Sequence, residues 1–149
     1  MARKYFNREE AEELLPMIGR ALEDARRQKR AIGSLTEEIS VAATRIMALG
    51  GSLPPFAELH RKKARRNEGV EHLARMIDEI HQAGCLVKDL EMGLVDFPSL
   101  REGQEIYLCW KLGEEHIGFW HGIEEGFSGR KPLDDSRSEE APPESSRLQ

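Results

Sequence analysis

The chain has 149 residues, a net charge of −5, and 33% charged beside 39% hydrophobic residues. This length suits one domain with one hydrophobic core, and the acidic balance excludes a general attraction to nucleic acid or to an anionic membrane. No run approaches the roughly 20 apolar residues that cross a bilayer, and the N-terminus lacks the pattern of a secretory signal. We therefore expect a cytoplasmic protein without a membrane partner.

The first half of the chain has the pattern of two long helices. Asn7 and Glu10 have the spacing of a capping box at a helix start. Apolar or small residues then recur at intervals of three and four as far as residue 49, which predicts one long helix with a buried face. Pro16 is expected to kink this helix or to restart it. The sequence GGSLPP at residues 50–55 predicts a turn, and a second apolar stripe predicts a helix that ends near Gly84.

From Cys85 onward the hydrophobic residues alternate with a period of two, which predicts β-strands. The expected strands are residues 85–90, 93–97, 105–112 and 116–121. Gly113 and Glu114 separate the last two strands, and this pair suits a two-residue type II′ hairpin turn. The resulting register pairs Trp110 with Ile117, Leu108 with Phe119, and Ile106 with His121.

These elements combine into a single α+β domain over residues 1–130. A long antiparallel helical hairpin, residues 7–84, packs on a small antiparallel meander of three to four strands, residues 85–121. Residues 131–149 are charged and rich in Ser and Pro with almost nothing apolar, which predicts a disordered acidic tail. The second helix would be on the order of 45 Å long, so two helices alone cannot bury their stripes well. We therefore expect a homo-oligomer, most simply a homodimer.

The rare residues of the chain gather in the predicted strands. Both tryptophans, one of the two cysteines and two of the five histidines lie between residues 105 and 121. The candidate binding patch consists of Asp96, Tyr107, Cys109, Trp110, Glu114, His116, Trp120, His121 and Arg130. Cys85 and Cys109 are interpreted as packed thiols rather than a disulfide, because buried free cysteines are the rule in reducing compartments. A reactive thiol at Cys109 is the alternative, followed by metal ligation.

The predicted register separates the two side chains that chemistry would combine. Cys109 points to the face opposite Trp110, whereas His121 shares the face of Trp110. Cys109 and His116 are then the only soft ligands on their face, and two ligands do not make a zinc site. We therefore expect no metal and no cofactor.

The remaining candidates each have a structural interpretation. His121 is expected to be a hydrogen-bonded structural residue rather than a general base. Asp96 alternates away from the core face, so it is expected to be solvated or to cap the following turn. Glu114 is expected to be a turn residue, and Arg130 is expected to bind an anion or to close the last turn of the domain.

The basic run HRKKARR, residues 60–66, is the best argument for nucleic-acid binding. It winds around the predicted helix and lacks the interleaved aromatic residues on which bases stack. In the predicted hairpin residues 61–66 lie alongside residues 38–43, where Glu37 and Glu38 can meet the nearer arginines. A solvated, partly paired helix face is therefore favoured over a nucleic-acid site at Arg61–Arg66.

Several segments together resemble a known family. They are YFNREEA at residues 5–11, LLP at 14–16, GCLVKDL at 84–90, GLVDFP at 93–98, YLCWKLGE at 107–114, Ile117, Trp120-His121, Gly126-Phe127 and Gly129-Arg130. Over roughly residues 5–133 the chain resembles the prokaryotic proteins of domain of unknown function 2203. The resemblance implies a small cytoplasmic protein and no particular activity. Its signature positions are Asp96, Cys109, Trp110, Glu114, Trp120, His121 and Arg130.

These observations favour a non-catalytic interaction or scaffolding protein that acts as a homo-oligomer with an unknown protein partner. The alternative is a small-molecule-binding protein or enzyme with a pocket on the sheet around Cys109, Trp120 and Asp96. The third hypothesis is a weak nucleic-acid binder that uses Arg61–Arg66.

Overall fold

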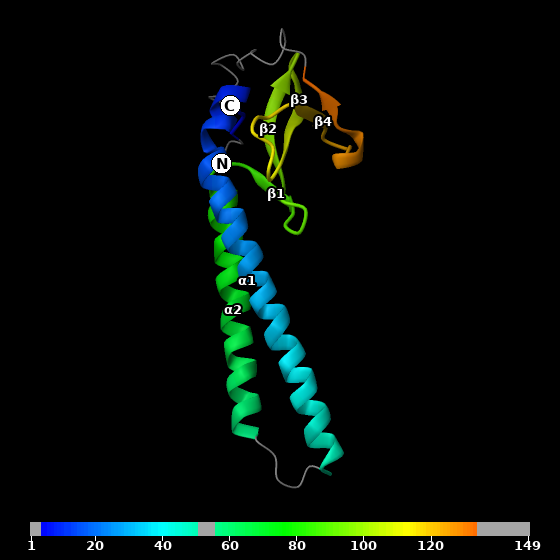
Figure 1. Ribbon diagram of the computed structural model, residues 1–149. Helices are drawn as coiled ribbons and strands as arrows, with labels where there is room; N and C mark the ends of the chain where they lie inside the picture. Colours follow the sequence, from blue (N-terminus) through cyan, green and yellow to red (C-terminus); the bar gives the residue numbers. More distant parts are fainter. Residues whose placement is uncertain (1–3, 51–55, 134–149) are drawn as a thin grey trace. The chain divides into compact units, whose positions relative to one another are not determined.

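The computed structural model describes residues 4–50 and 56–133. The helices are α1 (Arg8–Ala48) and α2 (Phe56–Gln82), and the strands are β1 (Leu86–Asp89), β2 (Leu94–Arg101), β3 (Gln104–Lys111), β4 (Phe119–Gly122) and β5 (Lys131–Pro132). The strands form one antiparallel sheet in the order β1-β2-β3-β4-β5 (Figure 1). The predicted α+β class is confirmed.

The chain divides into two compact units. The sheet unit comprises Met1–Glu23 with Asp78–Gln149, and the hairpin unit comprises Asp24–Ile77. Within the described residues, each unit takes one segment from α1 and one from α2. The sheet unit also holds all five strands.

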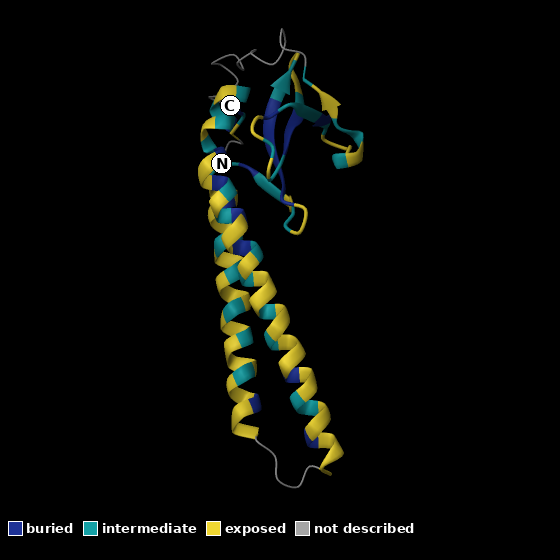
Figure 2. Cartoon of the chain, viewed as in Figure 1, coloured by how far each residue is buried: buried dark blue, intermediate teal, exposed yellow. Residues whose placement is uncertain are grey.

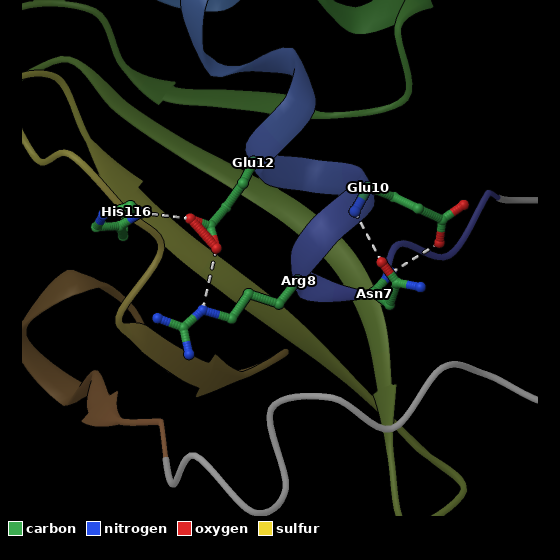
Figure 3. Close-up of polar contacts among 5 residues, drawn as sticks. All are labelled: Asn7, Arg8, Glu10, Glu12 and His116. Atoms are coloured by element: carbon green, nitrogen blue, oxygen red, sulfur yellow. Dashed lines mark hydrogen bonds and ion pairs between the residues drawn. The ribbon is translucent and has the colours of Figure 1, made fainter.

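Helix α1 begins at the predicted capping box. The Glu10 backbone N–H donates to Asn7 Oδ1 over 2.7 Å, and the Asn7 backbone N–H donates to Glu10 Oε1 over 3.0 Å (Figure 3). These two bonds satisfy donors that have no partner inside the helix. Pro16 lies inside α1 without ending it, and the helix continues to Ala48. The prediction of one long helix to about residue 49 is therefore confirmed.

The two helices run antiparallel in the hairpin unit. Gln28 Nε2 donates to the Gly69 carbonyl over 3.1 Å, and Lys62 Nζ lies 3.3 Å from Glu38 Oε1. The small apolar cluster between the helices consists of Ile39, Ile46 and Leu59, with Ala42 against it. Most of the predicted turn at residues 50–55 lies outside the described residues. No helix in the described part of the chain is both long and apolar enough to cross a membrane.

The sheet has one strand more than the three to four predicted. Lys131 and Pro132 form β5, which pairs with Trp120 and Phe119 of β4. The prediction that the disordered tail starts at residue 131 is wrong for these two residues, and residues 134–149 lie outside the described part of the chain. A two-residue strand of Lys and Pro carries no hydrophobic alternation, which is why the sequence pattern did not indicate it.

The hydrophobic core of the sheet unit lies between α1 and one face of β2 and β3. Its buried members are Phe6, Ala11, Leu15, Ile18, Leu22, Ile80, Cys85, Val95, Phe97, Ile106, Leu108, Trp110 and Ile117. The rings of Phe6 and Phe97 meet edge to face with centroids 5.3 Å apart. Buried residues concentrate in β2 and β3, while exposed residues predominate along the helices (Figure 2).

The register of β3 and β4 differs from the prediction by one residue. Tyr107, not Ile106, lies opposite His121, and the full pairing is Ile106 with Gly122, Tyr107 with His121, Leu108 with Trp120, and Cys109 with Phe119. The connection is not a two-residue turn, because β3 ends at Lys111 and β4 begins only at Phe119. A shift of one residue moves every side chain of a strand to the other face. His121 is therefore on the face of Cys109, opposite to the predicted arrangement.

Candidate functional site

Three titratable side chains meet on the face of the sheet that points away from the core. Asp96 of β2 is the register partner of Cys109 of β3, and His121 of β4 lies opposite the residue two before Cys109. One ligand atom from each of the three lies within 4.8 Å of those of the other two. Asp96 is 2% exposed, Cys109 1% and His121 2%, so water is largely excluded from the cluster.

Both ring nitrogens of His121 have a polar partner. Its Nδ1 lies 2.8 Å from the Gly122 carbonyl oxygen, which can only accept, so Nδ1 carries a hydrogen. Its Nε2 faces Asp96 and lies 3.0 Å from each carboxylate oxygen. This contact requires a hydrogen between Nε2 and the carboxylate, because otherwise both groups would face each other as acceptors.

Burial shapes the protonation of the cluster. It raises the pKa of the Asp96 carboxyl, and the hydrogen bond and charge of His121 partly offset this rise. Burial, together with the negative charge of Asp96, raises the pKa of the Cys109 thiol to about 11, while the Arg130 guanidinium acts in the opposite direction. Cys109 is therefore a thiol at neutral pH in the metal-free site, which argues against an activated nucleophile.

Arg130 reaches this thiol from a supported position. Its Nη1 and Nη2 donate to the two carboxylate oxygens of Glu114 over 3.2 and 2.9 Å. Its guanidinium also lies over the rings of Phe119 and Phe127, 3.8 and 4.4 Å from their centroids. A bidentate carboxylate and two aromatic faces fix a guanidinium more firmly than a surface ion pair does.

Glu114 does more than the turn residue that the sequence predicted. Its carboxylate also accepts a hydrogen bond from the Lys111 backbone N–H over 2.8 Å, and its carbonyl accepts one from Trp110 Nε1 over 2.9 Å. Gly113 before it has φ +106, a conformation that L side chains rarely adopt. The loop between β3 and β4 is therefore built around Glu114.

A cavity of about 200 Å³ opens beside the cluster. It is lined by Lys88, Leu94, Asp96, Cys109, His121, Glu125, Gly126 and Phe127. Glu125 is neutralised by Lys131, whose Nζ lies 2.7 Å from its carboxylate. Lys88 is exposed, lies 5.3 Å from the Tyr107 ring centroid, and acts electrostatically on Asp96. The cavity thus joins the buried polar cluster to two exposed charged residues, Lys88 and Glu125.

The candidate patch of the sequence analysis is only partly brought together. Tyr107 contacts His121, with ring centroids 5.5 Å apart. Trp110 lies on the opposite face in the core. Trp120 is half-buried, with the cations of Arg101 and Lys131 each 4.6 Å from its ring centroid.

His116, predicted to share the face of Cys109, is instead an exposed loop residue. Its Nδ1 lies 2.8 Å from Glu12 Oε2, and Arg8 Nε donates to the other oxygen of Glu12 over 3.2 Å (Figure 3). His116 therefore links the loop before β4 to helix α1 and takes no part in the buried cluster.

Sequence reasoning missed five residues that line the cavity, namely Lys88, Leu94, Glu125, Gly126 and Phe127. All of them except Glu125 fall in segments that carry the family resemblance, but no ligand spacing or charge pattern in the sequence marked them as site residues. The expectation that Asp96 is solvated is wrong, since it is buried. A usable signal existed, because Asp96 shares its side of the predicted sheet with Cys109 and Tyr107, two residue types that are often buried.

In the hairpin unit the basic run at residues 60–66 meets acidic neighbours. Lys62 Nζ lies 3.3 Å from Glu38 and 3.5 Å from Glu58. The basic run therefore lies near Glu38 as predicted, but the cation that meets Glu38 is Lys62, where an arginine was predicted. Arg61, Lys63 and Arg65 are exposed.

Fold and site together define an α+β protein whose meander carries a buried Asp, Cys and His cluster beside a small cavity. The chain belongs to the family described as uncharacterized conserved protein, DUF2203, whose model matches residues 4–133. No curated protein and no solved structure matches the chain significantly. The match extends from residues before α1 through β5, so it includes the whole cluster.

Proposed function

We propose that this protein binds a divalent transition metal, with zinc as the best fit, through Asp96, Cys109 and His121. The observation that carries the proposal is that one carboxylate oxygen, one sulfur and one imidazole nitrogen converge within 4.8 Å in a buried cluster. The expectation of no metal rested on a register in which Cys109 and His121 lie on opposite faces, and that register is wrong.

The donor set fits zinc in kind and in spacing. Zinc binds thiolate, imidazole and carboxylate at about 2.3, 2.0 and 2.1 Å, so its ligand atoms stand roughly 3.3 to 3.7 Å apart in a tetrahedron. The Asp96 and His121 atoms are 3.0 Å apart, and all three ligand atoms lie within 4.8 Å. Shifts of about an ångström or less therefore suffice to close the site on an ion.

The surroundings of the ligands also fit a metal site. Metal-binding histidines usually donate their second ring N–H to a carbonyl or carboxylate, and His121 Nδ1 does so to Gly122 while Nε2 faces the cluster. The Arg130 guanidinium is held by Glu114, and its positive charge would stabilise the Cys109 thiolate that a metal requires.

Metal binding is tested on protein stripped with a chelator and reloaded with Zn²⁺ or Co²⁺. We expect one ion per chain and, with Co²⁺, the charge-transfer absorption of a thiolate ligand. Cys109→Ser should abolish that absorption, and His121→Asn should lower the affinity about 10- to 100-fold or more. Cys85→Ser and His116→Asn are the matched controls, since neither residue belongs to the cluster. Equal binding by wild type and Cys109→Ser would refute the proposal.

A second candidate function is self-association through the hairpin unit. Large apolar side chains are exposed there at Val41, Met47, Leu49 and Phe56, and they supply apolar area that a second copy of the chain could bury. Sedimentation over a range of concentrations should then show a dimer that Met47→Glu with Phe56→Glu dissociates. Arg65→Glu is the control, and a monomer at all concentrations would exclude this function.

We also propose that the protein is cytoplasmic. Cys85 and Cys109 are both free and buried, which is typical of proteins from reducing compartments.

A further inference from the structure

The proposed metal site has fewer protein ligands than zinc requires. Asp96, Cys109 and His121 supply three donors, and zinc is almost always four-coordinate in proteins. No fourth Cys, His, Asp or Glu joins the group among the residues that the structure describes. Three protein ligands with one open position are typical of sites at which zinc binds a water or an exogenous ligand.

The cavity beside the cluster is where a ligand at the open metal position would lie, and its volume limits the size of that ligand. All three ligands line it, and its volume is about 200 Å³. Pockets for drug-sized ligands span roughly 300 to 1,000 Å³, so this cavity suits a ligand of a few non-hydrogen atoms. Leu94 and Phe127 supply the large apolar side chains of its lining.

The charges around the cavity favour a monovalent anion. A divalent ion is neutralised by the Asp96 carboxylate and the Cys109 thiolate. Glu125 is paired with Lys131, and Glu114 with Arg130. Lys88 remains, and it forms no ion pair among the residues that the structure describes. One positive charge at the rim is therefore left for a ligand to neutralise.

From these observations we infer that the open metal position takes a small carboxylate, whose second oxygen binds the Lys88 ammonium. This inference rests on the proposed metal-binding function. One carboxylate oxygen completes the coordination of the ion, which prefers oxygen, nitrogen or sulfur donors. The other oxygen accepts a charge-assisted hydrogen bond from Lys88, whose exposed side chain can adjust to the ligand.

The experiment uses the full chain loaded with Co²⁺ and titrated with formate or acetate at constant ionic strength in a non-coordinating salt. We expect a saturable change in the visible absorption of Co²⁺. Lys88→Met should weaken formate binding about 10-fold or more, because a hydrogen bond to a charged group contributes about 1.5 to 3 kcal/mol. Lys111→Met is the matched control, since Lys111 packs over Phe127 and does not line the cavity. Its formate affinity should stay within about twofold of wild type.

The possible failures are distinct. If Co²⁺ does not bind in one equivalent per chain, the metal-binding function is refuted, and this inference with it. If Co²⁺ binds but formate and acetate leave its spectrum unchanged, the metal site stands and the carboxylate site is refuted. Equal formate affinities of wild type and Lys88→Met would also overturn the inference, because the role of Lys88 distinguishes a built site from simple anion coordination.

Discussion

The sheet unit and the hairpin unit use segments of the same two helices, yet they bury their side chains to different extents. Among the described residues, the apolar cluster of the sheet unit contains 13 buried residues and that of the hairpin unit contains three. A helix packed on a sheet encloses a volume, whereas two helices meet along a line. The helical segments that lack a sheet keep large apolar side chains exposed, such as Met47 at 80%.

This difference decides where polar chemistry can be buried. Asp96 and His121 meet with side chains that are each 3% exposed, in the sheet unit. The ion pair of Glu38 and Lys62 in the hairpin unit has side chains 53% and 21% exposed. Only an enclosed region withholds water from charged groups strongly enough to change what they do. The candidate site therefore lies in the sheet unit.

The largest expected effect is the loss of stability when a core side chain of the sheet unit is truncated. Phe97→Ala removes a fully buried ring that meets Phe6, and it should cost about 4 kcal/mol of unfolding free energy. Ile39→Ala in the hairpin unit should cost about 2 kcal/mol, the low end for such a change, because water already reaches its surroundings. Urea unfolding of both variants measures the two values. Equal losses would contradict the difference between the units.

A second change tests the buried pair. Asp96→Ala leaves the His121 imidazole buried without its carboxylate partner, and the unfolding free energy should fall by about 3 kcal/mol. The measurement is urea unfolding with a chelator present, so that metal loss does not contribute. A loss under about 1 kcal/mol would mean that the pair is not desolvated in solution.

A third prediction concerns alkaline pH. Burial raises the pKa of the Cys85 thiol from 9.0 to about 11. Below pH 9 both states keep this proton, so stability is complete, whereas above it the unfolded chain loses the proton first. Stability should fall between pH 9 and 11, by on the order of 2 kcal/mol for this residue.

Cys85→Ala provides the control for this pH dependence. Its stability should fall less steeply than that of wild type between pH 9 and 11, because the contribution of the Cys85 thiol is gone and Cys109 is the one cysteine left. Parallel profiles for the two proteins would contradict the assignment to Cys85.

The smallest expected effect lies in the hairpin unit. Glu38→Gln removes the ion pair with Lys62 and should cost less than about 0.5 kcal/mol, because exposed pairs contribute little. Thermal unfolding in low and high salt measures it. A larger loss would show that the hairpin unit is better enclosed than its exposed fractions indicate.

The helices and their start could be predicted because the information is local. Asn7 and Glu10 bond to each other within one turn, and a stripe with helical spacing persists as far as Ile46. Neither depends on distant residues. Pro16 was expected to disturb α1, but a continuous apolar face on both sides of it keeps the helix in one piece.

The site could be predicted only as a region of the chain. The correct register depends on Glu114, whose carboxylate bonds to Arg130 as well as to the Lys111 backbone. No spacing rule reveals a partner 16 residues away, so Gly113-Glu114 was interpreted as a simple turn. Phe127, which lines the cavity together with Asp96, likewise lies in a segment whose sequence has no strand or helix pattern.

The spread of the cluster along the chain determines when it can form during synthesis. Asp96, Cys109 and His121 come from three different strands, and the supporting Arg130 follows them all. A ribosome delivers the N-terminal helices first. An emerging chain thus presents no complete set of ligands until residue 121 is free to pair with β3. A metal ion would therefore bind here only when the protein is nearly complete. Ligands spaced two or three residues apart in the sequence could instead bind an ion early in synthesis.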